Sequence, residues 1–262
     1  MSRCAVRPSA SLVAVFVIVT LAGAAMAQES RVQQARTLLV AWNVDPTRVD
    51  RARELLEAEV ADSPSVDALV ALSNAWFLTG EFRARSDAER QAAYREGARA
   101  AQRAIAMAPD SERAHLLLAY NSGRSAEITG VMHALGLVGT IRAESETVLR
   151  LNPSSVGGLI LAGGLAAGLP KMMGGDRGKA EQYFTRALTI DPHETGGRLE
   201  LAKLYVAQNR WAEAAPQLQT IIADDEPTDR PRWVMSDRPR AREMLFELRA
   251  RGHEPGVPPQ SP

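Results

Sequence analysis

The residues most suggestive of chemistry form one glycine-rich stretch, MGGDRGKA at residues 173–180. Glycine N–H groups beside a lysine at the start of a helix are the parts of a phosphate-binding loop. The spacing does not fit such a loop, because Met173 stands where the first glycine is required and alanine, not serine or threonine, follows the lysine. We therefore expect a structural turn, in which Gly174 and Gly175 allow positive φ and Asp176 caps the next helix.

The histidines show no metal-binding pattern. None of His115, His133, His193 and His253 stands three or four residues from another histidine. Because a metal ion needs several ligands on one side of a helix or turn, we expect no metal site.

Two further patterns fail as catalytic groups on spacing. Ser125 lies in GRSAE, which lacks the second glycine of a nucleophile elbow and has helical surroundings. The carboxylates at 144 and 146, and those at 224 and 225, are too close in sequence to face each other on a helix. The sequence therefore predicts a protein that is not an enzyme and that holds no cofactor.

The elements that position these residues are helices that stop at a recurring phrase. ALTIDP at residues 187–192 is echoed by VLRLNP at 148–153 and AIAMAP at 104–109. Each phrase closes an amphipathic helix, because proline lacks an N–H and its ring blocks another turn. A stop that returns every few tens of residues indicates a helical repeat, in which each hairpin buries its apolar face against its neighbours.

The repeats resemble tetratricopeptide units. From Thr195 onward, small and large apolar residues fall where the two helices of a unit of that family cross, and these are Leu201, Ala202, Tyr205, Ala214, Leu218 and Ile221. The preceding unit carries the second-helix pattern with Ala180, Phe184, Ala187 and Pro192. The match is close over residues 154–226 and looser over 65–153, where each unit has about ten extra residues. The resemblance implies an all-α fold, a right-handed α-α superhelix of the TPR-like solenoid type.

These patterns divide the chain into five parts. We expect a signal peptide at 1–27, an N-terminal capping helical hairpin at 28–64, TPR-like repeats with insertions at 65–228, a C-terminal loop and capping helix at 229–252, and a disordered tail at 253–262. Within these parts, residues 82–94 are predicted to be an exposed extension and residues 224–237 a loop. Ser236 or Asp237 is predicted to cap the last helix, which Gly252 ends.

The N-terminal segment has the composition of a cleaved leader. Arg3 and Arg7 precede an apolar run at residues 12–21, and AMA at 25–27 supplies the small residues that a signal peptidase recognises. Cleavage after Ala27 removes Cys4, the only cysteine, and predicts a periplasmic or secreted protein. The apolar run is shorter than the roughly 20 residues needed to span a bilayer, so we do not expect an integral membrane protein after cleavage.

The charge balance narrows the class of partner. Lys and Arg total 31 and Asp and Glu total 31, so the chain is formally neutral. Nucleic-acid binding draws on an excess of basic residues, so we expect no nucleic-acid partner and a protein or peptide partner instead.

In tetratricopeptide proteins the first helix of each pair lines a concave groove, and that register selects the candidate partner-binding residues. Most are apolar, whereas family members that hold a peptide's carboxy terminus use several Lys, Arg and Asn residues there, so a carboxylate clamp is not expected. The small residues of 156–169 have two interpretations. They could leave space for a small apolar ligand, or they could let neighbouring helices cross closely. The groove residues are Val70, Asn74, Phe77, Arg113, Leu116, Tyr120, Gly157, Ile160, Gly164, Leu199, Lys203 and Val206.

A narrower resemblance covers residues 141–248. The GGD turn at 174–176, Lys179, Phe184 and the RAR at 240–242 are similar to the T-component associated with some TRAP-type solute transporters. That family is extracytoplasmic, and it is proposed to partner a solute-binding protein and to hold a small hydrophobic ligand. Two hypotheses therefore stand: a secreted or periplasmic scaffold that binds proteins through its concave face, and a transporter accessory that binds an apolar ligand and a solute-binding protein.

Overall fold

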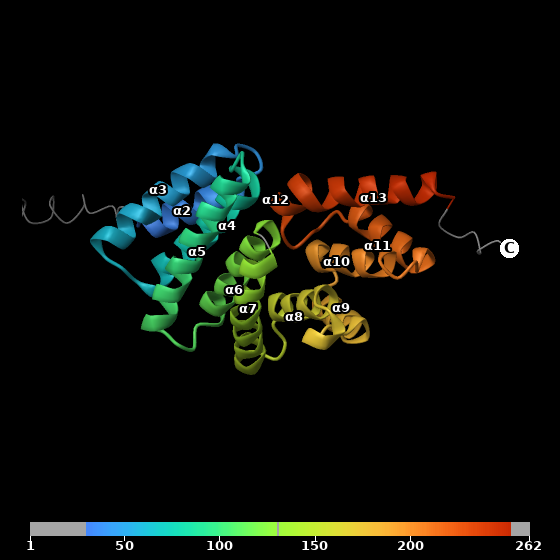
Figure 1. Ribbon diagram of the computed structural model, residues 1–262. Helices are drawn as coiled ribbons and strands as arrows, with labels where there is room; N and C mark the ends of the chain where they lie inside the picture. The colour runs from blue at the N-terminus through green and yellow to red at the C-terminus, as the bar shows by residue number, and fades with distance from the viewer. Residues whose placement is uncertain (1–29, 130, 253–262) are drawn as a thin grey trace, which may run out of the picture.

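The computed structural model describes residues 30–129 and 131–252, and within these ranges the chain forms helices and short turns without a β-strand (Figure 1). The fold is an all-α, TPR-like solenoid, as the sequence predicts. The predicted signal peptide and the predicted tail lie outside the described residues. None of the helices described is long and apolar enough to cross a membrane.

The helices follow one another as antiparallel pairs, closed by a C-terminal helical segment. The pairs are α2 (Arg31–Val40) with α3 (Thr47–Asp62), α4 (Val66–Phe82) with α5 (Asp87–Met107), α6 (Glu112–Ile128) with α7 (Val131–Leu151), α8 (Val156–Gly168) with α9 (Arg177–Ile190), and α10 (Thr195–Val206) with α11 (Trp211–Ala223). The closing segment comprises α12 (Arg230–Arg232), the π-helical turn η2 (Trp233–Asp237) and α13 (Arg238–Ala250).

Local sequence explains where the helices begin and end. Ser65, Ser86 and Ser155 each accept a hydrogen bond from the backbone N–H three residues on, at 3.1 to 3.2 Å, so that a side chain satisfies a free donor at the start of α4, α5 and α8. The prolines of the recurring phrase stand two residues past the ends of α5, α7 and α9. The proline stops predicted from the sequence are thus confirmed.

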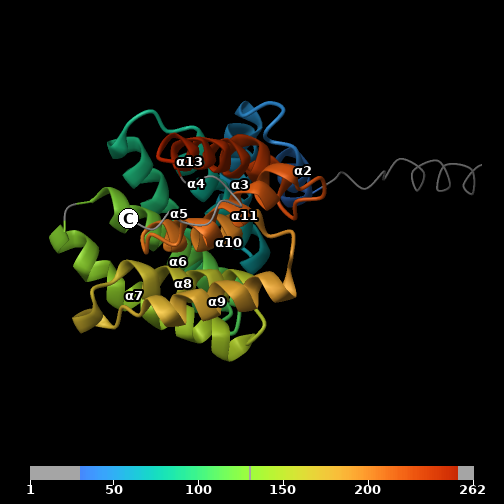
Figure 2. The ribbon, with the colours of Figure 1, turned by 90° about the vertical axis from the view of Figure 1, so that its right-hand side faces the viewer.

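Small residues bring the first helices of neighbouring pairs side by side. A Cβ added at Gly157 would lie 2.7 Å from the Leu116 side chain, and one added at Gly197 would lie 2.8 Å from Ile160. Thus α8 packs between α6 and α10 at distances that only glycine allows. The view from the C-terminal side shows α13, α11, α10 and α9 succeeding one another down the stack (Figure 2).

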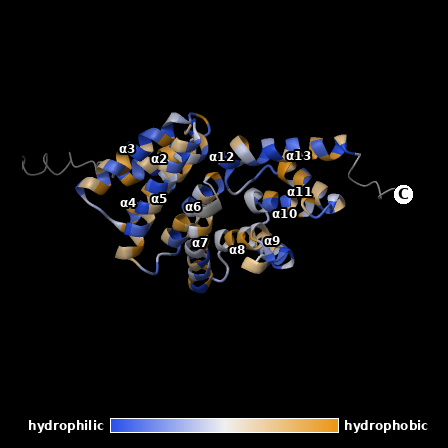
Figure 3. Ribbon diagram, viewed as in Figure 1, coloured by the Kyte–Doolittle hydropathy of each residue, from blue (hydrophilic) through white to orange (hydrophobic). Residues whose placement is uncertain are grey.

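Two apolar cores hold the solenoid together. One is built from α2 to α6 and includes Leu56 and Leu69, while the other runs from α8 to α13 and includes Phe184 and Leu218. Between them, α8 is apolar along its whole length, VGGLILAGGLAAG, and carries no charged residue (Figure 3). Its side chains therefore offer only apolar contacts, and hydrogen bonds from neighbouring elements reach its backbone carbonyls.

The predicted exposed extension at 82–94 is wrong. Phe82 ends α4 and its ring lies 4.2 Å from that of Trp42, centroid to centroid. Residues 87–94 are the first part of α5, where the Tyr94 ring is buried against Gly80. The extra residues of this unit lengthen its second helix, whose polar outer face led to the prediction of an exposed extension.

The predicted loop at 224–237 is wrong in its second half. Residues 230–250 form a helical segment, in which the buried Trp233 donates its indole N–H to the Ile221 carbonyl at 2.7 Å. Asp237 stands at the N-cap position of α13, as predicted, but its side chain makes no capping hydrogen bond. The Asp237 carboxylate instead accepts a hydrogen bond from the Thr195 hydroxyl at 2.9 Å and is 1% exposed.

The turn between α8 and α9 is built by the GGD phrase. Gly174 has φ +93°, and a Cβ at Gly175 would lie 1.7 Å from the Leu169 carbonyl oxygen, so both positions require glycine. The Asp176 carboxylate accepts the Lys179 N–H at 3.0 Å and caps α9.

Candidate functional site

The predicted groove residues divide by exposure. Leu116 and Leu199 are only 5% and 2% exposed, so they pack between helices and present almost no surface. Arg113 is exposed at the start of α6. The others lie half-buried along α4, α6, α8 and α10, apart from Gly164, which is exposed; the half-buried set comprises Val70, Asn74, Phe77, Tyr120, Gly157, Ile160, Lys203 and Val206.

A row of aromatic rings runs from α5 through α4 to α6. The Phe77 centroid lies 6.2 Å from that of Tyr94 and 6.0 Å from that of Tyr120, within the range of favourable ring pairs. The Tyr120 hydroxyl donates to the Gly157 carbonyl on α8 at 3.3 Å. This row fixes Tyr120 between α4 and α8 at the middle of the solenoid.

One wall beside this row is charged. On α4, the Glu81 carboxylate accepts hydrogen bonds from the Arg124 guanidinium of α6 at 2.5 and 3.1 Å and from the Tyr94 hydroxyl at 2.5 Å. The same guanidinium binds the Glu127 carboxylate one turn further along α6. The wall is therefore rigid, because Arg124 and Tyr94 both hold Glu81.

A second charged wall stands opposite, at the start of α10. The Glu194 carboxylate caps α10 by accepting the Gly196 and Gly197 N–H groups at 3.0 and 3.3 Å. From α12, the Arg232 Nε donates to Asp237 at 3.4 Å. Arg232 and Asp237 come from a segment that lies beyond the repeats in sequence, and they complete the site.

The space between the walls is floored by α8 and by the Lys203–Glu200 ion pair of α10. Gly164 lies two turns beyond Gly157 on the same stripe of α8, and nothing stands within 4 Å of a Cβ added there. The Lys203 ammonium binds Glu200 at 2.7 Å. The floor is thus apolar and open along α8 and charged at its edge.

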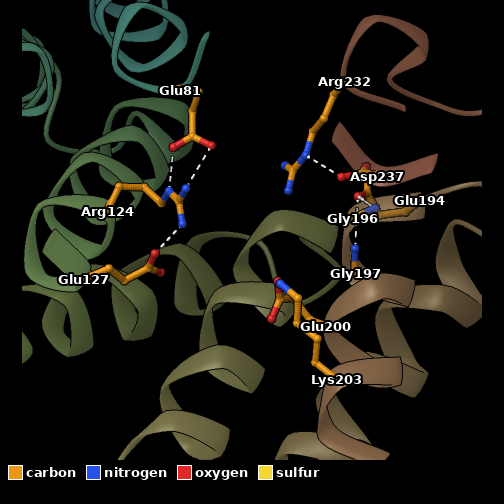
Figure 4. Close-up of polar contacts among 10 residues, drawn as sticks. All are labelled: Glu81, Arg124, Glu127, Glu194, Gly196, Gly197, Glu200, Lys203, Arg232 and Asp237. Atoms are coloured by element: carbon orange, nitrogen blue, oxygen red, sulfur yellow. Dashed lines mark hydrogen bonds and ion pairs between the residues drawn. The ribbon is translucent and has the colours of Figure 1, made fainter. Parts of the chain in front are cut away.

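Figure 4 shows the side chains of both walls directed toward one common space, with Glu200 and Lys203 below them. We call this space the central hollow. The charged residues that define it are Glu81, Arg124, Glu127, Glu194, Glu200, Lys203, Arg232 and Asp237. We assign Tyr120 to it from the charges that act on its ring, and Gly164 from the stripe of α8 that it shares with Gly157.

Two side chains of the hollow have pKa values that burial raises. Burial raises the pKa of the Glu127 carboxyl, although 61% of that side chain is accessible to solvent. Burial also raises the pKa of Tyr120 to about 12, and the charges of Arg232 and Glu194 act on Tyr120 from the opposite wall. The Glu127 carboxylate thus lies among protein groups while most of its side chain stays accessible to solvent.

The prediction of a mostly apolar groove needs correction. The charged groups of the first wall stand one or two turns beyond the predicted residues, with Glu81 four residues after Phe77, and Arg124 and Glu127 four and seven after Tyr120. Extending the same stripe of each helix would have found them. The Arg232 and Asp237 side chains were missed because their segment was predicted to be a loop.

The other candidate groups do not form a reactive site. The structure pairs His115 with Glu144, and His193 with Asp224 at 2.9 Å, across helices and not at helical spacing. Ser125 is buried in α6. Within residues 30–129 and 131–252, no three His, Cys, Asp or Glu side chains stand together as metal ligands. The arrangement supports contact by charge, aromatic rings and apolar surface.

Two surface depressions lie away from the hollow. One follows α9 past Glu181 and Thr185, and the other lies between α11 and α13 beside Phe246. Both are open, and neither includes a residue of the predicted groove.

Comparisons with known proteins agree with this architecture. Residues 172–235 match the tetratricopeptide repeat family. A thermophilic TPR protein from Thermus thermophilus has a similar structure, with a TM-score of 0.60, 18% identity, and coverage of 81% of this chain and 99% of that one. A tetratricopeptide repeat protein from Parabacteroides merdae aligns with a TM-score of 0.43 at 18% identity, covering 83% and 80% of the two chains. No curated protein matches the chain in sequence.

Proposed function

We propose that this protein is an extracytoplasmic TPR-type scaffold that binds a protein partner in the central hollow. The observation that carries the proposal is the hollow itself, where charged groups held by hydrogen bonds and ion pairs on separate helices face one space (Figure 4), with Tyr120 near enough for the charges of Arg232 and Glu194 to act on it. Repeat proteins use such concave surfaces for binding.

The hollow has the parts of a recognition surface. Tyrosine and arginine are enriched among residues that dominate binding energy, and Tyr120, Arg124 and Arg232 supply both. The Glu81 and Asp237 contacts hold the two arginines in place before a partner arrives, which reduces the entropy that binding costs. The polar groups therefore act as fixed contacts.

A binding role also accounts for the chemistry of the chain. The described carboxylates of the hollow bind arginines, a lysine, backbone N–H groups or the hydroxyls of Tyr94 and Thr195, and these contacts hold the side chains in place. We accordingly assign no catalytic step. The extracytoplasmic location rests on the leader at residues 1–27.

The second candidate function is the transporter accessory that the sequence suggests. Its small apolar ligand would rest on α8, and the open surface at Gly164 is the observation that favours it. Small-molecule sites bury most of their ligand. Because Glu127 and Arg232 keep 61% and 44% of their side chains accessible, the hollow fits a protein segment better than an enclosed small molecule.

Site-specific photo-crosslinking in the producing cell tests the proposal. A photoreactive amino acid replaces Gly164 in the hollow or, as the matched control, Gly139 on α7, which is also an exposed glycine facing open space. We expect a protein adduct at position 164 that position 139 does not give. Adducts of equal yield at both positions, or none at 164, would refute the hollow as the binding site.

A further inference from the structure

The depression between α11 and α13 is a second candidate surface, separate from the central hollow. Its lining residues are Gln219 and Ile222 of α11 and Arg242, Leu245, Phe246 and Arg249 of α13. Leu245 is buried, whereas the next residue, Phe246, is 73% exposed. Phenylalanine and arginine are both enriched in protein interfaces relative to the rest of a protein surface. We call this surface the α13 groove.

The groove carries positive charge that the described residues do not neutralise. Within residues 30–129 and 131–252, neither Arg242 nor Arg249 makes an ion pair or a hydrogen bond through its guanidinium. The lining residues include no carboxylate, and of the two carboxylates of α13, Glu243 and Glu247, the second lies 3.9 Å from Arg251. Two cations therefore stand beside an exposed ring without an anionic partner in the described chain.

The position of α13 in the solenoid indicates the shape of a partner. Each of α2, α4, α6, α8 and α10 packs against the second helix of its own pair. By contrast, α13 packs against α11 of the preceding pair, at the edge of the C-terminal half in Figure 1, and the side of α13 that carries Phe246 is exposed. A helix laid along the α13 groove would contact α13 as second helices contact the first helices of the earlier pairs.

We propose that the α13 groove binds an acidic amphipathic helix of a partner protein. Arg242 and Arg249 stand two turns apart, about 10 Å along α13, so carboxylates two turns apart on the partner helix reach both. Each guanidinium holds a carboxylate through two parallel N–H bonds, and apolar residues between the carboxylates cover Phe246. The groove lies outside the hollow, so this binding is additional to the function proposed above.

An anionic lipid surface offers the same charge in a different shape. A bilayer would meet the whole exposed side of α13, where its headgroups would repel Glu243 and Glu247. A helix in the groove meets only the lining residues, which bring arginine, glutamine and apolar groups. The arrangement of charges therefore favours a helix over a membrane.

Peptide selection on the purified full-length chain tests the proposal. A phage-displayed library of random peptides about 20 residues long, enough to form a helix, is depleted on the Phe246→Ala variant and then selected on the natural chain. We expect the selected peptides to be net negative, with carboxylates two turns apart and apolar residues between them at helical spacing. The best peptide, fluorescently labelled, should bind at least about tenfold more weakly to Arg242→Gln/Arg249→Gln, and more weakly as salt rises.

Matched variants show whether the effect belongs to the groove. Arg95→Gln/Arg103→Gln removes two exposed arginines of α5, and Met172→Ala removes an apolar side chain that is 94% exposed on the turn after α8. Both should leave the affinity unchanged, as should Gly164→Phe, which fills the hollow. Circular dichroism establishes that each variant is folded.

The proposal is overturned by selection of basic or uncharged peptides, by selection of none, or by unchanged affinity of the acidic peptide for the arginine variant. Binding to phosphatidylglycerol vesicles that Arg242→Gln/Arg249→Gln removes, with no acidic peptide selected, would assign the groove to a lipid surface instead. A dimer in analytical ultracentrifugation that Phe246→Ala separates would assign it to a second copy of the chain. None of these results affects the claim for the hollow, which Gly164→Phe tests.

Discussion

At the scale of single residues, Glu194 has two roles with opposite effects on the pKa of its carboxyl. Its carboxylate caps α10, which favours the charged form, while its place in the second wall removes water from it. Burial is the larger effect and raises the pKa of Glu194, against the lowering by Arg232 and the two N–H groups. Ionisation of this carboxyl therefore lowers the stability of the folded state.

That cost predicts a pH dependence. Because the folded pKa of Glu194 lies above the unfolded value of 4.5, the unfolded chain ionises first, and this carboxyl lowers stability as pH rises from about 4.5 through the folded pKa. Glu194→Gln keeps an oxygen to accept the N–H groups and removes the titration. We expect its urea midpoint to fall less between pH 4.5 and 7 than that of the natural chain. Parallel pH curves for the two proteins would contradict this assignment.

Asp176 illustrates a residue whose role is structural. Its carboxylate accepts the Lys179 N–H at 3.0 Å and lies on an exposed turn outside the hollow. Asp176→Ala should cost about 0.5 to 2 kcal/mol of unfolding free energy, as the loss of an N-cap does. The amount of partner bound per folded molecule should not change. A folded variant that had lost binding would show that the GGD turn takes part in recognition.

At the scale of elements, α8 is a packing element on one side and an open floor on the other. Gly163 faces α9, where an added Cβ would lie 2.6 Å from the buried Phe184 ring. Its neighbour Gly164 faces the hollow, with open space around it. A side chain at position 163 would therefore clash with Phe184, whereas a side chain at position 164 would meet no other atom.

This difference is measurable with a pair of alanine variants. Gly163→Ala should destabilise the fold by about 1 to 3 kcal/mol, because the ring and helix must shift apart. Gly164→Ala should instead stabilise it by up to about 1 kcal/mol, since alanine is the better helix former and meets no atom. Chemical denaturation of both variants gives the comparison. Equal stabilities would show that α8 does not pack as described.

Sequence patterns predicted the helical pairs well, but they failed for two segments. Proline stops and the pattern around Phe184 predicted the helical pairs, because both reflect local backbone chemistry. The segments at 82–94 and 224–237 were predicted as extension and loop because their residues are charged. In the fold, Tyr94 and Trp233 bury one side of each segment, and such tertiary contacts leave little periodic signal in a short stretch.

The site was predictable only in part for the same reason. Phe77, Tyr120 and Lys203 follow from the register of the first helices, which repeats along the chain. Arg232 faces Tyr120 only because residues 230–250 continue as one helical segment across the end of the stack. Nothing in the local sequence around Arg232 indicates that neighbour, so this wall of the hollow depends on the three-dimensional fold.

At the scale of the whole molecule, the two apolar cores hold the walls of the hollow apart. The Arg124 wall rests on the core of α2 to α6, and the Arg232 wall rests on the core of α8 to α13. In Figure 1 α12 lies on the side of the C-terminal half that is turned toward α4 and α6, with α10 and α8 below it. The shape of the hollow is therefore a property of the complete stack, since no single repeat contains it.

A separate prediction concerns the cellular location of the protein. If the segment at 1–27 is a cleaved leader, the mature chain begins at Gln28 and is found outside the cytoplasm. Mass spectrometry of the N-terminal peptide from fractionated cells gives the answer. Recovery of the chain from the cytoplasm with its N-terminal 27 residues intact would contradict this prediction.

The central claim is that recognition takes place in the hollow, and filling the hollow tests it most directly. Gly164→Phe places a ring in the open space above α8, whereas Gly139→Phe places the same ring on an exposed site of α7. Both variants should keep the melting temperature of the natural chain, because neither added side chain meets another atom at its Cβ. The partner recovered with each variant from the producing cells is then measured by quantitative mass spectrometry. We predict that Gly164→Phe recovers at least about tenfold less partner than Gly139→Phe, a difference of about 1.4 kcal/mol in binding. Equal recovery by the two folded variants would contradict the claim.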